Sequence, residues 1–285
     1  MSAYFFLILA MVCSASISIV MKLFPVREGN RYALVLGNYI ACIMVGFLML
    51  PDKGAILHPH KITMLLSIIG GAIFVAGFAS QQVSIGINGA ILTSAFARLG
   101  LLVPITVSIL CFQERPTLLQ GIALILVVAA VIVINGGSAE DATKKLKPLL
   151  LIVVLLSVGG AETMSKIFLR VGDSSQDRLF ILGIFFFAAI VTTVLLVHES
   201  ITQGKKVVQK DFFAGMLAGV PNYFASALLL KSLAGLPAIL VYPMYSTGVI
   251  VVVTLVSAVA FKEQPGRRGW IGLVMILCAV VLLNV

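Results

Sequence analysis

The chain consists of long apolar runs separated by short polar breaks. The hydrocarbon core of a bilayer is ~30 Å thick, so a helix rising ~1.5 Å per residue needs about 20 apolar residues to cross it. Runs of this length recur ten times, and we predict spans at 3–24, 32–50, 62–82, 90–112, 117–134, 149–170, 179–197, 212–231, 238–261 and 269–285.

These runs predict helices, because segments such as GIALILVVAAVIVI lack the strict alternation of transmembrane strands. The first run has no charged segment before it and no small-residue cleavage site, so we expect it to be retained as a span. Composition agrees: 60% of residues are hydrophobic and 11% are charged, against about a quarter charged in soluble domains. We therefore expect an all-α integral membrane protein, multi-pass, in the cell membrane and in contact with its lipid.

The net charge of +9 belongs to the breaks between the runs. The Lys and Arg residues form no basic stripe alternating with aromatic residues, so we expect no nucleic-acid partner. Breaks after odd-numbered runs hold more basic residues than the others, which favours both termini on the outer side of the membrane.

A repeat divides the chain into two halves. The longest polar break, GGSAEDATKKLKP at 136–148, has five runs on either side, and FQERPTLLQGIALIL at 112–126 matches FKEQPGRRGWIGLVMIL at 261–277. A weaker match joins GINGAILTS (86–94) to GLPAILVYP (235–243). We predict repeats at 1–135 and 149–285 with a connecting loop at 136–148. Because each repeat has an odd number of spans, the second must lie inverted in the membrane.

The F-x-E-x-P break before a Gly-containing last span resembles the drug/metabolite transporter superfamily, specifically its ten-span EamA-type members. The resemblance covers essentially the whole chain and implies a central cavity formed by the first four helices of each half. It also implies a peripheral fifth and tenth helix that support packing or dimer contact, so monomer and homodimer both stay open. This chain lacks a Trp in its first and sixth spans, which weakens an aromatic-cage cation site. The residues that carry the resemblance are Phe112, Glu114, Gln120, Gly121, Ile122, Phe261, Glu263, Gly269, Trp270, Ile271 and Gly272.

Two charges lie well inside predicted spans, Arg98 and Glu162. A charge at mid-bilayer costs about 2.5–3.5 kcal/mol on insertion scales, so such residues are usually functional. We expect Arg98 to bind an anionic group such as a substrate carboxylate, and Glu162 to bind an amine or a coupling proton. The alternative is that they pair with each other, or Glu162 with Lys166, and only fix helix packing.

Further candidates are polar residues near prolines and at span ends. Pro221 and Pro243 interrupt the helix hydrogen-bond ladder and free carbonyl groups beside polar side chains, and Pro104 offers a similar weak point in the fourth span. Lysines near span ends could rim the cavity or extend to the membrane surface. The expected substrate-binding set is completed by Asn38, Gln81, Asn222, Tyr223, Tyr242 and Tyr245, and the rim candidates are Lys22 and Lys166.

Enzymatic and metal sites have little support in the sequence. Glu114 and Glu263 precede prolines, where we expect each carboxylate to favour the positive N-terminal end of the helix that follows. His58, His60 and His198 have no further ligand neighbours, and no nucleotide-binding or hydrolase motif is present. We therefore expect no metal, no cofactor and no enzymatic activity.

The combined expectation is a secondary transporter that moves a small polar metabolite by alternating access, in export or exchange, with an amino acid or related solute as the favoured cargo. Multidrug, nucleobase or organic-cation transport by the same fold, and a lipid-modifying membrane enzyme, remain as alternatives.

Overall fold

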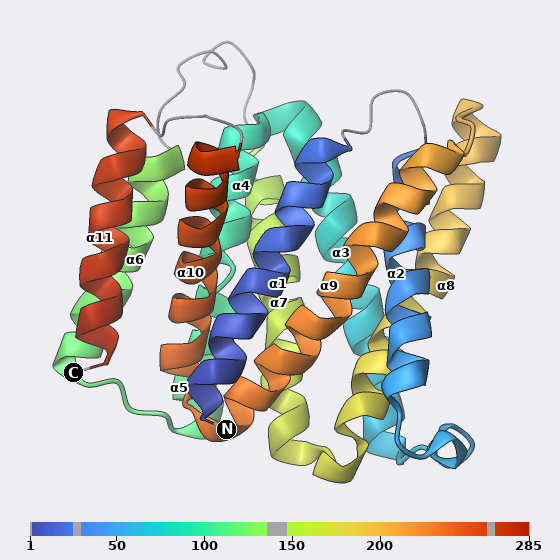
Figure 1. Ribbon diagram of the computed structural model, residues 1–285, viewed down its shortest axis with the longest axis horizontal. Helices are drawn as coiled ribbons and strands as arrows, with labels where there is room; N and C mark the ends of the chain where they lie inside the picture. Colours follow the sequence, from blue (N-terminus) through green and yellow to red (C-terminus); the bar gives the residue numbers. More distant parts are fainter. Residues whose placement is uncertain (1, 25–29, 136–146, 261–265, 285) are drawn as a thin grey trace. The chain divides into compact units, whose positions relative to one another are not determined.

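The structure is a computed structural model that describes residues 2–24, 30–135, 147–260 and 266–284. The described residues are almost entirely helical and contain no strand. Two short 3-10 turns, η1 (Lys53–Ile56) and η3 (Ser174–Gln176), precede α3 and α8 (Figure 1). The α-helices are α1 (Ala3–Leu23), α2 (Arg31–Met49), α3 (Lys61–Asn88), α4 (Ala90–Leu99), α5 (Leu102–Phe112), α6 (Leu118–Asn135), α7 (Pro148–Val171), α8 (Asp177–Gln203), α9 (Gln209–Gly235), α10 (Ala238–Ala260) and α11 (Arg267–Leu283).

Eight helical segments among the described residues are long and apolar enough to cross a membrane. They comprise α1, α2, α3, α7, α8, α9, α10 and the segment Leu92–Phe112 that joins α4 to α5. The two remaining helices, α6 and α11, have 18 and 17 residues, which at ~1.5 Å per residue gives each a length of about 26 Å. The multi-pass, all-helical expectation is confirmed at the level of these eight segments.

The fourth predicted span contains a break. α4 ends at Leu99 and α5 begins at Leu102, with Gly100 and Leu101 between them in right-handed helical conformation. Pro104 has no N–H to give the Gly100 carbonyl four residues earlier, which weakens the ladder at this point. Pro221 and Pro243, by contrast, lie inside continuous helices.

Several helices are longer than the apolar runs that predicted them, and α3, α8 and α9 (Gln209–Gly235) show the largest differences. α3 continues to Asn88 rather than Gln82, and passes through Gly86, where we expected a break. The real stop is Gly89, whose φ of 82° suits a residue without a side chain. α8 likewise continues to Gln203. A count of apolar residues measures only the part in contact with hydrocarbon, so it misses polar turns that extend a helix beyond it.

The chain forms two compact units that interleave in sequence. Unit 1 contains residues 1–75 and 167–234, and unit 2 contains residues 76–166 and 235–285. Each unit therefore takes helices from both sides of the 136–148 break. The compact units and the predicted repeats, 1–135 and 149–285, are different divisions of the same chain.

Unit 1 is held together by close approach of helix backbones. α2 packs along α8, and a Cβ on Gly37 of α2 would collide with the Phe212 carbonyl of α9. In return, a Cβ on Gly215 or Gly219 of α9 would collide with backbone carbonyls of α2. Small residues let membrane helices pack this closely.

Unit 2 contains a second helix pair, α6 and α11, which lie side by side (Figure 1). A Cβ on Gly272 of α11 would collide with the side chain of Ile134, and Ala130, Ile250 and Ile276 form an apolar core beside it. The contact between Gly159 of α7 and Gly100, at the break after α4, brings two backbones together in the same unit.

Candidate functional site

A charged cluster in unit 2 begins with a tight turn after α5. Gln113 adopts a left-handed conformation (φ 57°, ψ 29°), and the Glu114 N–H donates to the Ser108 carbonyl at 3.1 Å. This arrangement ends the helix by satisfying one of its last free carbonyls. The turn directs the chain away from the α5 axis and places Glu114 beside a helix that is distant in sequence.

Glu114 binds the N-terminus of α10. Its Oε1 accepts a hydrogen bond from the Ala238 N–H and its Oε2 accepts one from the Ile239 N–H, both at 3.2 Å. The first N–H groups of a helix have no partner within the helix and carry partial positive charge. A carboxylate there is therefore stabilised both by hydrogen bonds and by the charge at the helix N-terminus.

Lys166 of α7 completes this arrangement. Its Nζ lies 2.6 Å from Glu114 Oε1, and the two side chains are only 10% and 15% exposed. The ion pair thus links α7, the turn after α5 and the start of α10.

The sequence placed Glu114 at the wrong helix. We expected its carboxylate at the start of the helix that follows it, which is α6. There the Thr117 hydroxyl accepts from the Gln120 N–H, and the Gln120 side chain accepts from the Thr117 N–H. This reciprocal capping box supplies the start of α6 without a carboxylate. Because α6 has its own cap, Glu114 is available to α10.

Glu162 lies one turn before Lys166 on α7. The Tyr242 hydroxyl of α10 donates to the Glu162 backbone carbonyl at 2.8 Å, and Tyr242 itself is fully buried. The Glu162 carboxylate is partly exposed and makes no hydrogen bond or ion pair with any described residue. The pairing of Glu162 with Lys166 that we considered is absent, because Lys166 binds Glu114.

Arg98 lies in the last turn of α4, two residues before the break at Gly100. It is partly exposed and forms no ion pair with Glu162 or with other described residues. The contact between Gly100 and Gly159 brings this end of α4 to α7 three residues before Glu162. Arg98 and Glu162 therefore lie on neighbouring segments of unit 2 without binding each other.

A second group of predicted residues lies in unit 1. The Asn222 side-chain amide of α9 donates to Asn38 Oδ1 of α2 at 2.7 Å, and the Cys42 thiol donates to the Gly219 carbonyl at 3.2 Å. Tyr223 is 2% exposed. These polar groups are neutral and bind each other between α2 and α9.

The other predicted residues are less informative. Gln81 donates to the Gly77 carbonyl of its own helix at 3.3 Å. Tyr245 lies on α10 one turn from Tyr242, and Lys22 lies in the last turn of α1. The structure thus places Lys22, Asn38, Asn222 and Tyr223 in unit 1, and Gln81, Arg98, Glu162, Lys166, Tyr242 and Tyr245 in unit 2.

Glu114 is the residue that sequence reasoning left out of the site. The repeated F-x-E-x-P motif did identify it, but a motif does not reveal which helix N-terminus the turn after α5 will meet. The second copy of the motif, with Glu263, lies outside the described residues. Within the described chain, no group of three or more His, Cys, Asp or Glu side chains could hold a metal ion.

Comparisons with known proteins give a fold and no activity. No protein-family model matches the chain. A protein of Haemophilus influenzae (strain ATCC 51907 / DSM 11121 / KW20 / Rd), described as an uncharacterized protein, is 27% identical over 291 residues, covering 97% of this chain and 96% of that one. One solved structure, described as the crystal structure of a protein, superposes with a TM-score of 0.72 at 14% identity. It covers 98% of this chain and 95% of its own, so the fold is shared over the full length.

Proposed function

We propose that this protein is a secondary transporter of a small polar metabolite, in the ten-span, inverted-repeat fold of the EamA-type drug/metabolite transporters. The observation that carries the proposal is the Glu162 carboxylate. It lies about 21 Å along α7 from Pro148, in a helix apolar enough to span a membrane, and has no described cationic partner. A carboxylate in such a place is costly unless it serves a ligand or a proton.

Helix pairing supports the inverted repeat. Counting α4 and α5 as one span, α2 and α8 are each second in their half, α5 and α10 belong to the fourth spans, and α6 and α11 are each fifth. In each of these three pairs, the two helices pack against each other. The pair α2 and α8 lies in unit 1, and the other two pairs lie in unit 2. Helices related by a two-fold axis that passes between them must contact their own counterparts, so this pattern is typical of two related halves.

The chemistry of unit 2 favours a zwitterionic solute, with an amino acid as the first candidate. Glu162 offers a carboxylate for an amine, and Arg98 offers a guanidinium that can bind a carboxylate through two hydrogen bonds. Neither group is neutralised by the other. The break at Gly100 and Pro104 gives the Arg98 segment a place to bend during alternating access, in export or exchange. A proton carried by the Glu162 carboxylate would be the coupling ion of this cycle.

The test is substrate-specific flux in proteoliposomes. We expect radiolabelled amino acids to exchange against an internal pool, and nucleobases, organic cations and sugars provide the competing arms. Glu162→Gln keeps the shape of the side chain and removes its charge, so exchange should fall at least tenfold with unchanged thermal unfolding. Asp52→Asn, at an exposed turn, is the matched control. A folded protein without flux for any class contradicts the proposal.

A further inference from the structure

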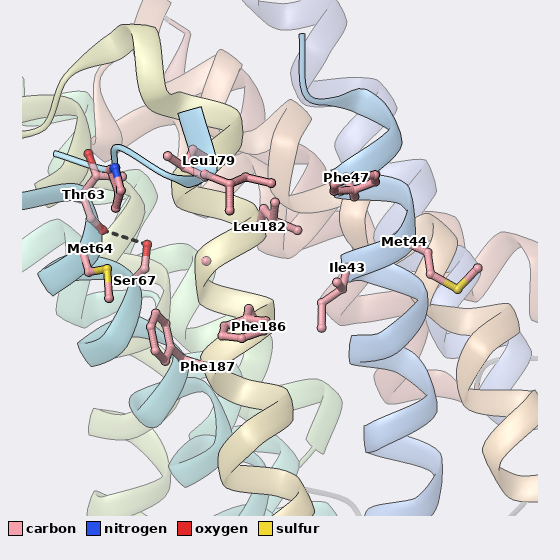
Figure 2. Close-up of a pocket in the computed structure, with 13 residues that line it drawn as sticks. Ile43, Met44, Phe47, Thr63, Met64, Ser67, Leu179, Leu182, Phe186 and Phe187 are labelled. Carbon is pink, nitrogen blue, oxygen red and sulfur yellow. Dashed lines mark hydrogen bonds between the residues drawn. The ribbon is translucent and has the colours of Figure 1, made fainter. Parts of the chain in front are cut away.

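An apolar groove lies in unit 1 among α2, α3 and α8 (Figure 2). Its volume is about 510 Å³, within the range of roughly 300–1,000 Å³ that small-molecule sites occupy. Met44, Phe47, Met64 and Phe186 line it, and each is between 42% and 54% exposed. In a helix bundle that spans a membrane, such side chains face hydrocarbon, so the groove opens toward lipid rather than toward water.

The groove extends about as far as one leaflet is deep. It begins at the loop residue Pro59 and at Leu179 in the first turn of α8, and it ends near Phe187. Eight residues separate Leu179 from Phe187, which corresponds to about 12 Å of helix. Half of a ~30 Å hydrocarbon core is about 15 Å. The groove therefore matches an acyl chain that starts at the membrane surface.

Two lysines stand at the surface end of the groove. The Lys53 Nζ lies 4.8 Å from the ring centroid of Phe47, a groove residue, and Lys61 is the first residue of α3. Among the described residues, no carboxylate forms an ion pair with either lysine.

The acidic residues at this end have other partners or other positions. Asp52 accepts from the Gly54 N–H, and Asp173 accepts from the Ser175 N–H and pairs with His60. Asp177 lies in the first turn of α8, where the helix dipole favours it. Arg178, another cation at this end, donates to the Met49 carbonyl. The two lysines are therefore available for an anion such as a phosphate.

A buried hydroxyl lies between the lysines and the apolar part of the groove. Thr63 is 1% exposed and lines the groove, yet its Oγ1 has no hydrogen-bond partner in the described part of the chain. The hydroxyl of Ser67, one turn along α3, is already used, because it donates to the Thr63 carbonyl at 2.8 Å (Figure 2) and also lies 3.2 Å from the Phe180 carbonyl. A buried hydroxyl normally has a partner, so this one calls for an acceptor in the groove.

We propose that this groove binds one acyl chain of an anionic phospholipid. The chain packs against Phe47, Met64 and Phe186, the Thr63 hydroxyl donates to an ester carbonyl, and Lys53 and Lys61 bind the phosphate. The order of groups matches the order within a lipid: charge at the surface, ester below it, hydrocarbon beneath. This site lies in unit 1 and does not depend on the transported solute proposed for unit 2.

The experiment measures which lipid stays bound. Full-length protein is placed in nanodiscs of equal phosphatidylglycerol and phosphatidylcholine, extracted into mild detergent and analysed by native mass spectrometry. We expect one phosphatidylglycerol to be retained at least tenfold over phosphatidylcholine. Each of Lys53→Gln and Lys61→Gln should weaken retention about fivefold, as expected for a lysine facing an anionic lipid surface. Lys210→Gln, at the start of α9 and away from the groove, is the matched control.

Two further variants test the groove itself. Met64→Trp should fill it and abolish retention, whereas Leu48→Trp, on an exposed position of α2 outside the groove, should not. Thr63→Val keeps the shape but removes the hydroxyl, so retention should fall severalfold even if Met64→Trp fails to fold. Three results would overturn the proposal. The two lipids could be retained equally, an apolar non-lipid molecule could be retained in their place, or the lysine and Thr63 variants could retain the lipid as the parent does.

Discussion

Two polar contacts, one in each unit, differ in charge. In unit 1, Asn38 and Asn222 bind each other at 2.7 Å, and the helices around them meet through glycines. In unit 2, Lys166 and Glu114 form a buried ion pair, and Glu162 lies one turn from it. Neutral amides satisfy each other at modest cost, but a buried charge depends on its partner. We infer that the contact between α2 and α9 is specified by shape, and the contact between α7 and α10 by charge.

This contrast also separates the proposed site of chemistry from a site of packing. Amide pairs between membrane helices typically act as adhesive contacts and leave no unsatisfied charge. Glu162, in contrast, keeps a carboxylate without a described partner. Variants in the two units should therefore fail in different ways.

The largest expected effect is the loss of one partner of the ion pair in unit 2. Lys166→Met removes the cation and leaves the Glu114 carboxylate, 15% exposed, with only the α10 N–H groups. Such a break costs about 3–5 kcal/mol, because an uncompensated buried charge remains. The free energy of unfolding in detergent, measured by denaturant titration, should fall by that amount.

A double variant separates charge from packing at the same place. With Glu114→Gln added to Lys166→Met, no charge remains, and most of the lost unfolding free energy should return. Lys210→Met, an exposed lysine of unit 1, controls for the loss of a positive charge. If the loss of unfolding free energy in the double variant equals the sum of the losses in the two single variants, the ion pair is not the cause of the instability.

A smaller effect is expected from the glycine contacts of unit 1. A Cβ on Gly215 would collide with the backbone carbonyl of Leu34, which cannot move as a side chain can. We expect Gly215→Ala to lower the unfolding free energy by about 1–3 kcal/mol, as overpacking usually does.

The matched control for this substitution lies in unit 2. A Cβ on Gly121 of α6 would meet no atom within 4 Å. Alanine favours a helix over glycine, so Gly121→Ala should leave stability unchanged or raise it by up to about 1 kcal/mol. Similar losses at both positions, measured in the same titration, would mean that close backbone packing does not explain the loss at Gly215.

The sequence predicted the helices well, because hydrophobic length is a local property. The expected span at 32–50 is observed as Arg31–Met49, and the one at 238–261 is observed as Ala238–Ala260. The helix α3 was underestimated because Gly86 and Asn88, where the sequence predicted a break, continue the helix. The ten-span count and the inversion of the repeats stay predictions.

The site was harder to predict, because pairing between distant segments is not a local property. Glu162 and Lys166 share a helix, so their proximity followed from spacing alone. That Lys166 binds Glu114, and that Glu114 binds the start of α10, depends on the direction of the turn at Gln113. Nothing in the spacing of Asn38 and Asn222 indicated their hydrogen bond either, although both were singled out as polar residues within spans.

The smallest expected effect concerns a charge pair on the surface of unit 1, which contrasts with the buried pair of unit 2. Hydrogen bonds from the Ser175 side chain and backbone, with a further contribution from His60, lower the pKa of Asp173 below its ordinary value of 3.8. A carboxylate with a lowered pKa stabilises the folded state above pH 3.8, and this contribution is lost as the pH falls through the folded-state pKa.

Asp173→Asn should therefore be slightly less stable than the parent at neutral pH, and the difference should vanish in stronger acid. Thermal unfolding as a function of pH measures this, with Ser175→Ala expected to reproduce part of the change. Because the Asp173 side chain is 38% exposed, added salt should weaken the contribution of His60, whereas the loss in Lys166→Met should persist in salt. Equal salt sensitivity of the two variants would remove the distinction between a surface charge pair and a buried one.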